Sequence, residues 1–327
     1  MTPIRWGILG PGKIARKFAL GLQSLPDARL VAVGSRKAEK AAAFSAEFNV
    51  PHAYGSYEAL VADPEVDVVY VATPNSMHHA TALLCLKAKK AVLCEKAFTL
   101  NAREAQDLVD CARRENVFLM EAIWARFLPP MVQVREWLAQ KAIGEPRMVV
   151  ADFGFRPDWN PEGRVLNPQL GGGALLDVGI YPLTFASMVL GAPLKVTGQC
   201  HMGVTGVDEQ AGMVLSYPAG ALAVLICAVR TRTLHEARIF GTEGSIYMPG
   251  FWHCSEATLM KTGQEPETVV PGRVGNGYNY EAAEVGRCLR AGLKESPVIP
   301  LSETLSTMRT MDALRQQWGL VYPQEKG

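Results

Sequence analysis

The segment IRWGILGPGKIA, residues 4–15, decides the fold of the first part of the chain. Its first six residues are an apolar run typical of a buried strand, and the residues after Gly12 show helical periodicity. Gly10, Gly12 and Ala15 form a GxGxxA pattern between the two elements. Such glycines often only make a tight turn, but a pattern placed between a strand and a helix is typical of a dinucleotide-binding turn.

The chemistry of this turn follows from its glycines and from the start of the helix. Gly10 and Gly12 let the backbone approach a pyrophosphate, and the helix that begins at Lys13 and Ile14 offers N–H groups and a positive dipole end. We therefore expect these four residues to bind the phosphates of a dinucleotide.

Strand and helix patterns alternate through the first third of the chain. DARLVAVGS, VDVVYVAT and KAVLCEK are apolar strand patterns separated by helix formers, a helix is predicted over 102–115, and the strand VFLMEA closes the series. Apolar strands that alternate with helices indicate a parallel sheet covered on both faces. The sequence predicts an α/β fold with a doubly wound Rossmann domain over residues 1–122.

The pattern changes beyond residue 122. A helix is predicted over 131–141, and strand patterns follow one another in LKVTGQCHM, EQAGMVLSYP, ALAVLICAVR and EARIFGTEGSIYM. Strands without helices between them indicate an open, mostly antiparallel sheet. We predict a second, α+β domain over residues 123–327 that binds the substrate.

Composition limits the classes of partner and compartment. The 327 residues carry 33 basic and 32 acidic side chains, a formal net charge of +1, which gives no electrostatic case for nucleic acid or an anionic membrane. The apolar run 219–229 is about half of the ~20 residues that a membrane helix needs. Seven scattered cysteines without ligand spacing indicate no metal site and reduced thiols, so we expect a cytoplasmic protein.

The end of the second strand distinguishes the two nicotinamide dinucleotides. The segment GSRK places Ser35, Arg36 and Lys37 where an acidic residue would accept hydrogen bonds from a bare ribose. A hydroxyl and two cations instead suit a ribose phosphate, so NADP(H) is the expected cofactor. The alternative is that Arg36 and Lys37 are a solvated helix start.

Longer motifs carry a resemblance. GILGPGKIA, ADPEVDVVYVATPNSMHH, VLCEKAFTLNAREA, EAIWARFLP, GGGALLDVGIYP and FGTEGSI occur in an order and at spacings that resemble the glucose-fructose oxidoreductase and inositol dehydrogenase family. Within it the chain is most similar to the dimeric dihydrodiol dehydrogenases and the NADP-dependent xylose dehydrogenases. The resemblance implies NADP(H)-dependent hydride transfer at a carbinol or carbonyl of a sugar, cyclic polyol or dihydrodiol, and a homodimer.

The resemblance also implies three catalytic residues. Lys96 of the EK motif, after Glu95, would lie beside the nicotinamide, and Asp177 and Tyr181 would complete the site. Lys96 ends a strand at the ligand-binding edge of the predicted sheet, and Asp177 and Tyr181 are four residues apart on one helix face. We expect Tyr181 to be the general acid/base, Lys96 to polarise the reacting oxygen, and Asp177 to orient substrate hydroxyls or Lys96. Without the resemblance, Lys96 would be interpreted as a surface charge, Asp177 as a polar residue on a helix face, and Tyr181 as a packing residue.

Further candidates for cofactor contacts lie after a strand and near the domain junction. They are Thr73, Pro74, Asn75 and His78 in TPNSMHH, and Trp124 and Arg126 in WARF. His78 is equally consistent with an ordinary helix start, and Trp124 with packing.

One departure from the family concerns Ala97, which stands where proline usually follows the lysine. If that peptide is cis in relatives, a non-proline residue pays ~3 kcal/mol to copy it, so a slightly different backbone is expected at Lys96. A non-catalytic NADP(H)-binding sensor remains the alternative function, although a sensor would not need Lys96 and Tyr181 together. A structural partner protein would need none of these motifs.

Overall fold

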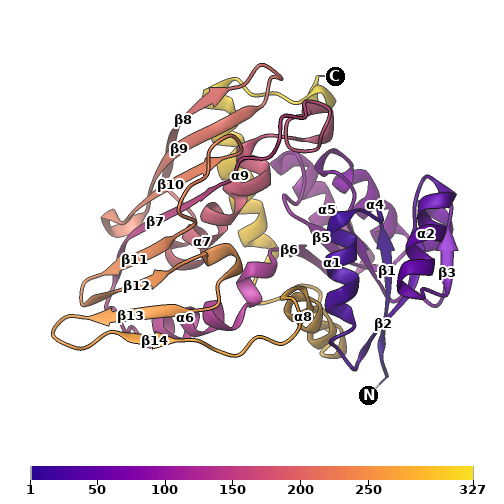
Figure 1. The fold of residues 1–327 in the computed structure, drawn as a ribbon, viewed down its shortest axis with the longest axis horizontal. Helices are drawn as coiled ribbons and strands as arrows, with labels where there is room; N and C mark the ends of the chain where they lie inside the picture. The colour runs from indigo at the N-terminus through magenta and orange to yellow at the C-terminus, as the bar shows by residue number, and fades with distance from the viewer. Residues whose placement is uncertain (1, 327) are drawn as a thin grey trace. The chain divides into compact units, whose positions relative to one another are not determined.

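The computed structural model describes residues 2–326, which form two compact units (Figure 1). The first unit combines the chain up to Trp124 with Val274–Thr304, and the second combines Ala125–Arg273 with the chain from Leu305 onward. The predicted division after residue 122 assigns residues 274–304 to the second domain, whereas by contact they belong to the first unit. Sequence periodicity carries no record of this return, because only tertiary packing brings the segment back.

The first unit is built on a six-stranded parallel sheet in the order β3-β2-β1-β4-β5-β6. This order places the topological switch point between β1 and β4, where the carboxyl ends of the strands open toward a ligand. The connections from β1 to β2 and from β4 to β5 run in opposite directions along the sheet. Because both are right-handed, they place α1 and α4 on opposite faces. The elements are β1 (Ile4–Leu9), α1 (Lys13–Leu22), β2 (Ala28–Gly34), α2 (Ala38–Phe48), β3 (His52–Tyr54), α3 (Tyr57–Val61), β4 (Val68–Val71), α4 (His78–Lys87), β5 (Ala91–Glu95), α5 (Ala102–Glu115), β6 (Leu119–Ala122) and α8 (Tyr278–Arg290).

Helix α8 returns to the first unit and packs against α1. The two helices approach closely at Gly21, where an added Cβ would lie 3.0 Å from the backbone nitrogen of Asn279. The segment after α8 also joins the sheet edge, because the Leu119 amide donates a 3.0 Å hydrogen bond to the Lys294 carbonyl. Residues far apart in sequence therefore complete one Rossmann unit.

The second unit is built on an eight-stranded sheet in the order β14-β13-β12-β11-β7-β10-β9-β8. All its pairs are antiparallel except β10 with β7, which are parallel. The two sheets confirm the predicted fold class. The elements are α6 (Pro129–Ala139), β7 (Pro146–Gly154), α7 (Ile180–Leu190), β8 (Lys195–Met202), β9 (Asp208–Ser216), β10 (Leu222–Ala228), β11 (Ala237–Gly241), β12 (Gly244–Met248), β13 (Ala257–Lys261), β14 (Glu267–Val269) and, from Leu305 onward, α9 (Leu301–Trp318).

Some elements of the second unit differ from the sequence expectations. The strand expected from EARIFGTEGSIYM is a hairpin of β11 and β12, which turns at Thr242 and Glu243. Strands β7, β13 and β14 were not predicted, because their mixed polar composition gives a weak signal. Helix α6 begins two residues before the expected 131–141 segment, with prolines in its first turn.

The two faces of the second sheet have different partners. Helix α7 packs on β7 and β10 (Figure 1). Side chains on the opposite face of these strands remain partly exposed. We call this exposed side the open face; its apolar residues include Met148, Val150, Val214, Leu222, Val224, Ile226 and Phe240.

One helical segment, Pro168–Leu190, is long and apolar enough by composition to cross a membrane. Its most apolar window has a mean hydropathy of 1.5, and 78% of that window is buried inside the fold. A core helix of a globular unit has these properties, and this segment contains α7.

Candidate active site

The two glycines of the turn between β1 and α1 have different surroundings: Gly10 packs against the backbone, and Gly12 leaves space where a side chain would begin. Gly10 has a positive φ of 89°, and a Cβ there would lie 2.8 Å from the Ala72 carbonyl oxygen. By contrast, a Cβ on Gly12 would meet only the Gly10 carbonyl at 4.0 Å. Helix α1 has no side-chain cap and no acidic residue in its first turn, so its N–H groups suit an anion. The turn therefore fits the pyrophosphate of a dinucleotide.

The end of β2 carries the predicted phosphate-binding residues. Ser35 is buried, and its hydroxyl accepts a 3.2 Å hydrogen bond from the Lys37 amide, while Arg36 and Lys37 are exposed. Arg36 lies near the Tyr57 hydroxyl, and its charge acts to lower the pKa of Tyr57. Burial is the larger influence, so the pKa of Tyr57 is raised. No carboxylate replaces Ser35 at this strand end, so the geometry fits a ribose phosphate.

Strand β5 ends at Glu95 and delivers Lys96 to the same edge of the sheet. Glu95 is buried; it accepts a hydrogen bond from the Tyr70 hydroxyl and a 3.2 Å bond from the Lys96 amide. Lys96 itself is half-buried, and the Lys96–Ala97 peptide bond is cis although residue 97 is alanine.

His78 connects two segments of this edge. Its ring nitrogens lie 2.8 Å from the Ala97 carbonyl and 2.8 Å from the Thr73 carbonyl. Burial lowers the pKa of His78 to about 4, and the nearby Lys96 charge adds to this effect. The two carbonyl contacts oppose it, because only a protonated ring donates from both nitrogens. His78 thus positions the backbone on either side of the expected nicotinamide site.

Glu121 fixes the backbone that follows Lys96. Its carboxylate accepts a 3.2 Å hydrogen bond from the Phe98 amide and a 3.0 Å bond from the Thr304 hydroxyl. Glu121 is 1% exposed and is not among the site residues predicted from the sequence. The sequence does contain a sign of this role, because Glu121 stands in the apolar strand VFLMEA. A carboxylate in a buried strand needs hydrogen-bond partners, since it is seldom buried without them.

The remaining candidates of the first unit lie in or next to the same region. Thr73 and Asn75 are buried after β4, and the Thr73 hydroxyl has no hydrogen-bond partner among residues 2–326. Pro74 precedes the short helix that begins at Asn75. Trp124 is 5% exposed and stacks on Tyr278 of α8, with ring centroids 4.6 Å apart. A direct contact of these residues with the cofactor stays a prediction.

In the second unit, Asp177 and Tyr181 lie where a π turn joins α7. The π turn covers Leu175–Gly179 and α7 begins at Ile180, whereas the sequence indicated one regular helix. Pro182 lacks the N–H that a regular α-helix would bond to the carbonyl of residue 178, which explains an irregular ladder here. Both candidate side chains are buried, Asp177 at 4% and Tyr181 at 6% exposure.

Asp177 pairs with Arg164, which the sequence analysis did not identify. The Arg164 Nη1 atom lies 2.5 Å from Oδ1 and its Nη2 atom 3.3 Å from Oδ2, a bidentate geometry. Arg164 comes from the polar loop after β7, where no regular pattern marks its position. Asp177 is therefore held in one orientation, as the expected orienting role requires.

Aromatic rings surround Tyr181 within the second unit. Phe153 lies 5.5 Å and Trp252 6.0 Å from it between ring centroids, and these two rings stack on each other at 4.5 Å. His235 adds an edge contact to Phe153 at 4.9 Å. These contacts restrict the Tyr181 side chain to few conformations, and the position of its hydroxyl is restricted with it.

Arg126 supports helix α7 through a hydrogen bond. It is 4% exposed, and its Nη2 atom donates a 2.8 Å hydrogen bond to the Thr184 carbonyl. Thr184 lies three residues after Tyr181, so Arg126 supports the helix that presents the candidate tyrosine. Its predicted cofactor contact stays a prediction.

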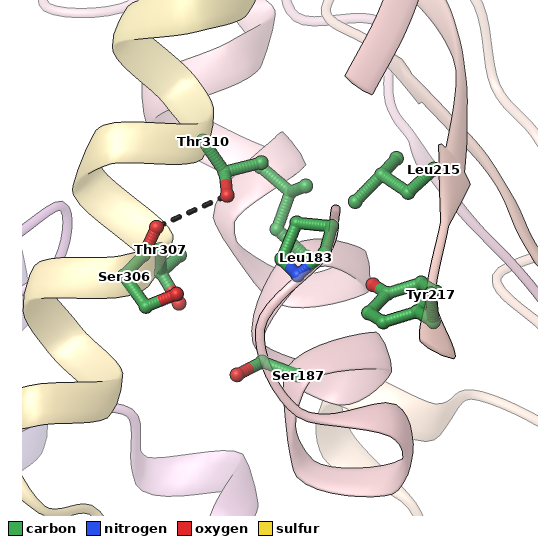
Figure 2. Close-up of a pocket in the computed structure, with 8 residues that line it drawn as sticks. Leu183, Ser187, Leu215, Tyr217, Ser306, Thr307 and Thr310 are labelled. Atoms are coloured by element: carbon green, nitrogen blue, oxygen red, sulfur yellow. Dashed lines mark hydrogen bonds between the residues drawn. The ribbon is translucent and has the colours of Figure 1, made fainter. Parts of the chain in front are cut away.

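A small cavity lies on the other side of α7 (Figure 2). Figure 2 shows Leu183 and Ser187 of α7 facing Tyr217 and the threonines of α9. Leu183 is two residues after Tyr181, which is about 200° around a helix. The cavity is large enough for about one water molecule, so it is too small for a sugar or diol.

Within residues 2–326 no group of three or more His, Cys, Asp or Glu side chains is arranged to hold a metal ion.

The fold and the site define a nucleotide-binding Rossmann oxidoreductase with a second α+β unit. Residues 4–123 match the oxidoreductase family with an NAD-binding Rossmann fold, and residues 131–247 match the GFO/IDH/MocA C-terminal domain. The chain belongs to the GFO/IDH/MocA family, which confirms the resemblance found in its motifs.

Full-length relatives support this membership. The chain is 41% identical to trans-1,2-dihydrobenzene-1,2-diol dehydrogenase of Mus musculus, with 99% of each chain covered. It is 39% identical to the Homo sapiens protein of the same name, again over 99% of each. A solved 3-ketoreductase of Actinomadura kijaniata in complex with NADP and TDP-benzene is 26% identical, with a TM-score of 0.85 over 96% of this chain and 98% of that one.

An aldose-aldose oxidoreductase of Caulobacter crescentus, solved with glycerol, has a TM-score of 0.88 over 96% of this chain and 98% of that one. At 24% identity this likeness supports the fold alone.

Proposed function

We propose that the protein is an NADP(H)-dependent dehydrogenase or reductase that acts on a CH–OH group of a dihydrodiol, cyclic polyol or sugar. The observation that carries this proposal is the edge of the first sheet, where the open glycine turn, the Ser35–Arg36 strand end and Lys96 lie at the carboxyl ends of β1, β2 and β5. That edge is where doubly wound sheets bind dinucleotides. The NADP-bound ketoreductase relative supports the choice of cofactor.

The residues divide the chemistry between them. The nicotinamide of the bound cofactor supplies or accepts the hydride. Lys96 polarises the reacting oxygen through its ammonium charge, and the Tyr181 hydroxyl exchanges the proton of the substrate hydroxyl. Asp177, held by Arg164, orients substrate hydroxyls through its remaining lone pairs. His78 and Glu121 hold the backbone around Lys96 in place.

The substrate class is supported by the relatives. The name that they carry, trans-1,2-dihydrobenzene-1,2-diol dehydrogenase, favours a cyclic diol over an open-chain polyol.

The test is a substrate panel with both cofactors. Dihydrodiols, aldoses, inositols and dicarbonyls are incubated with NADP⁺ or NADPH, and absorbance at the NADPH band is followed in both directions. Turnover of at least one cyclic diol or sugar, faster with NADP(H) than with NAD(H), is expected. Tight NADPH binding without turnover of any panel member would instead favour a sensor.

We also propose a homodimer that forms through the open face of the second sheet. Val214 and Ile226 on that face are 47% and 44% exposed, and a contiguous apolar face of this kind marks an interaction surface. Ile226→Lys should shift the mass measured by light scattering from dimer to monomer. Val204→Lys, at a 91% exposed position off this face, is the matched control and should leave the mass unchanged.

A cytoplasmic location is part of the same proposal. It is supported by the cysteines, all seven of which are free and six of which are buried. A secreted protein of this size would more often pair such residues. Fractionation of cells that express the protein, followed by immunodetection, tests the location.

A further inference from the structure

Asp208, the first residue of β9, reaches back to the start of the helix that carries the candidate catalytic residues. It is 0% exposed, and its Oδ2 atom accepts a 2.6 Å hydrogen bond from the Leu175 amide. Leu175 begins the π turn that contains Asp177 and leads into α7. The N-terminal amides of a helix have no partner within the helix, so a carboxylate supplied by another strand satisfies them.

The other carboxylate oxygen explains the third glycine of the GGG segment. Gly173 has a positive φ of 117°, and a Cβ at this position would overlap Oδ1 of Asp208. That oxygen is buried and has no hydrogen-bond partner among residues 2–326. The carboxylate is thus fitted against the backbone of Gly173 and Leu175, and its short hydrogen bond comes from the Leu175 amide.

Asp208 is surrounded by groups from several elements, and each can be assigned a charge. Arg315 of α9 is cationic and favours the carboxylate, whereas Cys200 of β8, Cys227 of β10 and Tyr322 near the end of the chain stay neutral at neutral pH. Burial raises the pKa of each of these three groups. Arg315 also pairs with Asp312 and Glu325, which divides its charge among three carboxylates.

Burial dominates the titration of Asp208 itself. It raises the pKa of Asp208 from 3.8 to about 7, against the amides of Leu175 and Ala174 and the charge of Arg315, which lower it. The carboxyl group therefore titrates near neutral pH, where an ordinary aspartate is fully ionised.

We propose that Asp208 is a positioning residue for the reaction: as a carboxylate it fixes the first turn of the helix that presents Asp177 and Tyr181, and protonation loosens that turn. The proposal rests on the proposed dehydrogenase function. A hydrogen bond to an ionised acceptor is about twice as strong as one to a neutral acceptor, so protonation of Asp208 weakens its hold on the Leu175 and Ala174 amides. Asp208 touches neither substrate nor cofactor in this account and acts through the helix.

The first experiment compares the pH profiles of kcat for wild type, Asp208→Asn and Glu209→Gln. The wild type should lose about 10-fold in kcat as the pH falls through about 7. Asp208→Asn should stay near the low-pH rate of the wild type and lack this limb, with unchanged NADPH affinity. Glu209→Gln, on the next residue of β9, should keep the wild-type profile. An unaltered limb in Asp208→Asn would overturn the proposal.

A second measurement does not depend on turnover. Because the pKa of Asp208 is higher in the folded state than its usual 3.8, the unfolded chain releases this proton first as the pH rises. The wild type should therefore lose stability relative to Asp208→Asn between about pH 4 and pH 7, measured as urea midpoints. Equal pH dependence in the two proteins would contradict the buried carboxylate.

Wild-type protein alone provides a third readout if Asp208→Asn does not fold. With ¹³C-carboxyl-labelled aspartate, one resonance should titrate near pH 7, and absence of any titration between pH 5.5 and 8.5 would overturn the proposal. A panel without any turnover would remove the proposed function, while the urea and NMR measurements would still decide on Asp208.

Discussion

Two glycine-rich segments, GPG at residues 10–12 and GGG at residues 171–173, look alike in sequence and differ in what fills the space beside them. A Cβ on Gly12 would meet no heavy atom closer than 4.0 Å. In the second segment, a Cβ on Gly172 would lie 2.7 Å from the Val165 carbonyl oxygen, and one on Gly173 would overlap Asp208. In the first segment Gly10 packs against the Ala72 backbone, but Gly12 leaves room that a ligand can use; in the second segment the space beside Gly172 and Gly173 is filled by the protein itself.

The difference teaches that a glycine motif has two distinct physical causes. In the first unit the glycine is there for a phosphate, so its loss should be felt in binding. In the second unit three separate parts of the chain converge on the motif, because Tyr322 also donates a 2.7 Å hydrogen bond to the Gly172 carbonyl. Loss of a glycine there should be felt in stability.

The strongest test of this comparison exchanges one glycine in each segment. Gly173→Ala combines a positive φ with steric overlap, so we expect a loss of about 4 kcal/mol in the free energy of unfolding, as for strain plus overpacking. Gly12→Ala should change that free energy by less than about 0.5 kcal/mol and weaken NADPH binding instead. Urea unfolding and fluorescence titration measure the two quantities.

Gly206→Ala separates backbone strain from overlap. Gly206 also has a positive φ, 83°, but a Cβ there would have no neighbour within 4 Å. It should lose only about 1–2 kcal/mol, the cost of the left-handed conformation alone. The comparison fails if Gly173→Ala costs no more than Gly206→Ala, or if Gly12→Ala unfolds the protein while binding NADPH normally.

The next largest effect is expected at Lys96, whose role lies in the chemistry of the first unit. Lys96→Met keeps most of the aliphatic stem and removes the ammonium, so turnover should fall ~100-fold or more while NADPH binding persists. Stability should change by less than about 1 kcal/mol. Steady-state kinetics on a substrate from the panel gives the answer.

Tyr181→Phe should cause a similar loss, and the double variant should be little worse than either single one, because residues that act as a unit are not additive. Lys87→Met, at an exposed position of α4, is the matched control. Wild-type turnover in Lys96→Met would return this lysine to the role of a surface charge.

A smaller effect is expected at Arg36, which tests cofactor binding in the first unit. Arg36→Ala should lose a charge-assisted pair worth roughly 1.5–3 kcal/mol, which is about 10- to 150-fold in NADPH affinity. NADH affinity should stay unchanged, because a bare ribose has no phosphate for the guanidinium. Isothermal titration with both cofactors measures this, and Lys40→Ala, an exposed cation on α2, is the control. Equal losses for NADPH and NADH would show that Arg36 does not contact the phosphate.

The smallest effect is expected at Arg164, which acts on the second unit through Asp177. Arg164→Met and Arg164→Lys should both lower kcat/KM by about 10-fold, because an ammonium does not replace a bidentate guanidinium. The free energy of unfolding should change by less than about 1 kcal/mol, since the Arg164 side chain is 51% exposed. Arg232→Met, on an exposed arginine, should behave as wild type. Full activity of Arg164→Lys would show that charge alone, and not orientation, is required.

The first unit could be predicted from the sequence in most respects because its signals are local. The strand, glycine turn and helix over residues 4–22, and the helix Ala102–Glu115, follow from periodicity and caps within short windows. Ser35, Arg36 and Lys96 were found because strand ends in a parallel sheet share one edge.

The second unit was harder to predict because its supporting residues act over long sequence separations. Asp208 binds an amide 33 residues away, and the Tyr322 hydroxyl binds a carbonyl 150 residues away. Arg164 lies in a loop without periodicity, and Glu121 reads as an ordinary strand end. A pattern within one window does not contain these pairs, so only the folded chain reveals them.

The return of residues 274–304 to the first unit also sets the order of events on the ribosome. The Rossmann sheet has all six strands once Ala122 has emerged, but α8 and the Thr304 hydroxyl that bonds Glu121 follow only after residues 125–273. At ~5–20 residues per second, the 180 residues from 124 to 304 take about 10–40 s to synthesise. Until α8 has emerged, the nascent first unit exposes the face of α1 that α8 later covers, and transiently exposed surface of this kind is prone to aggregation.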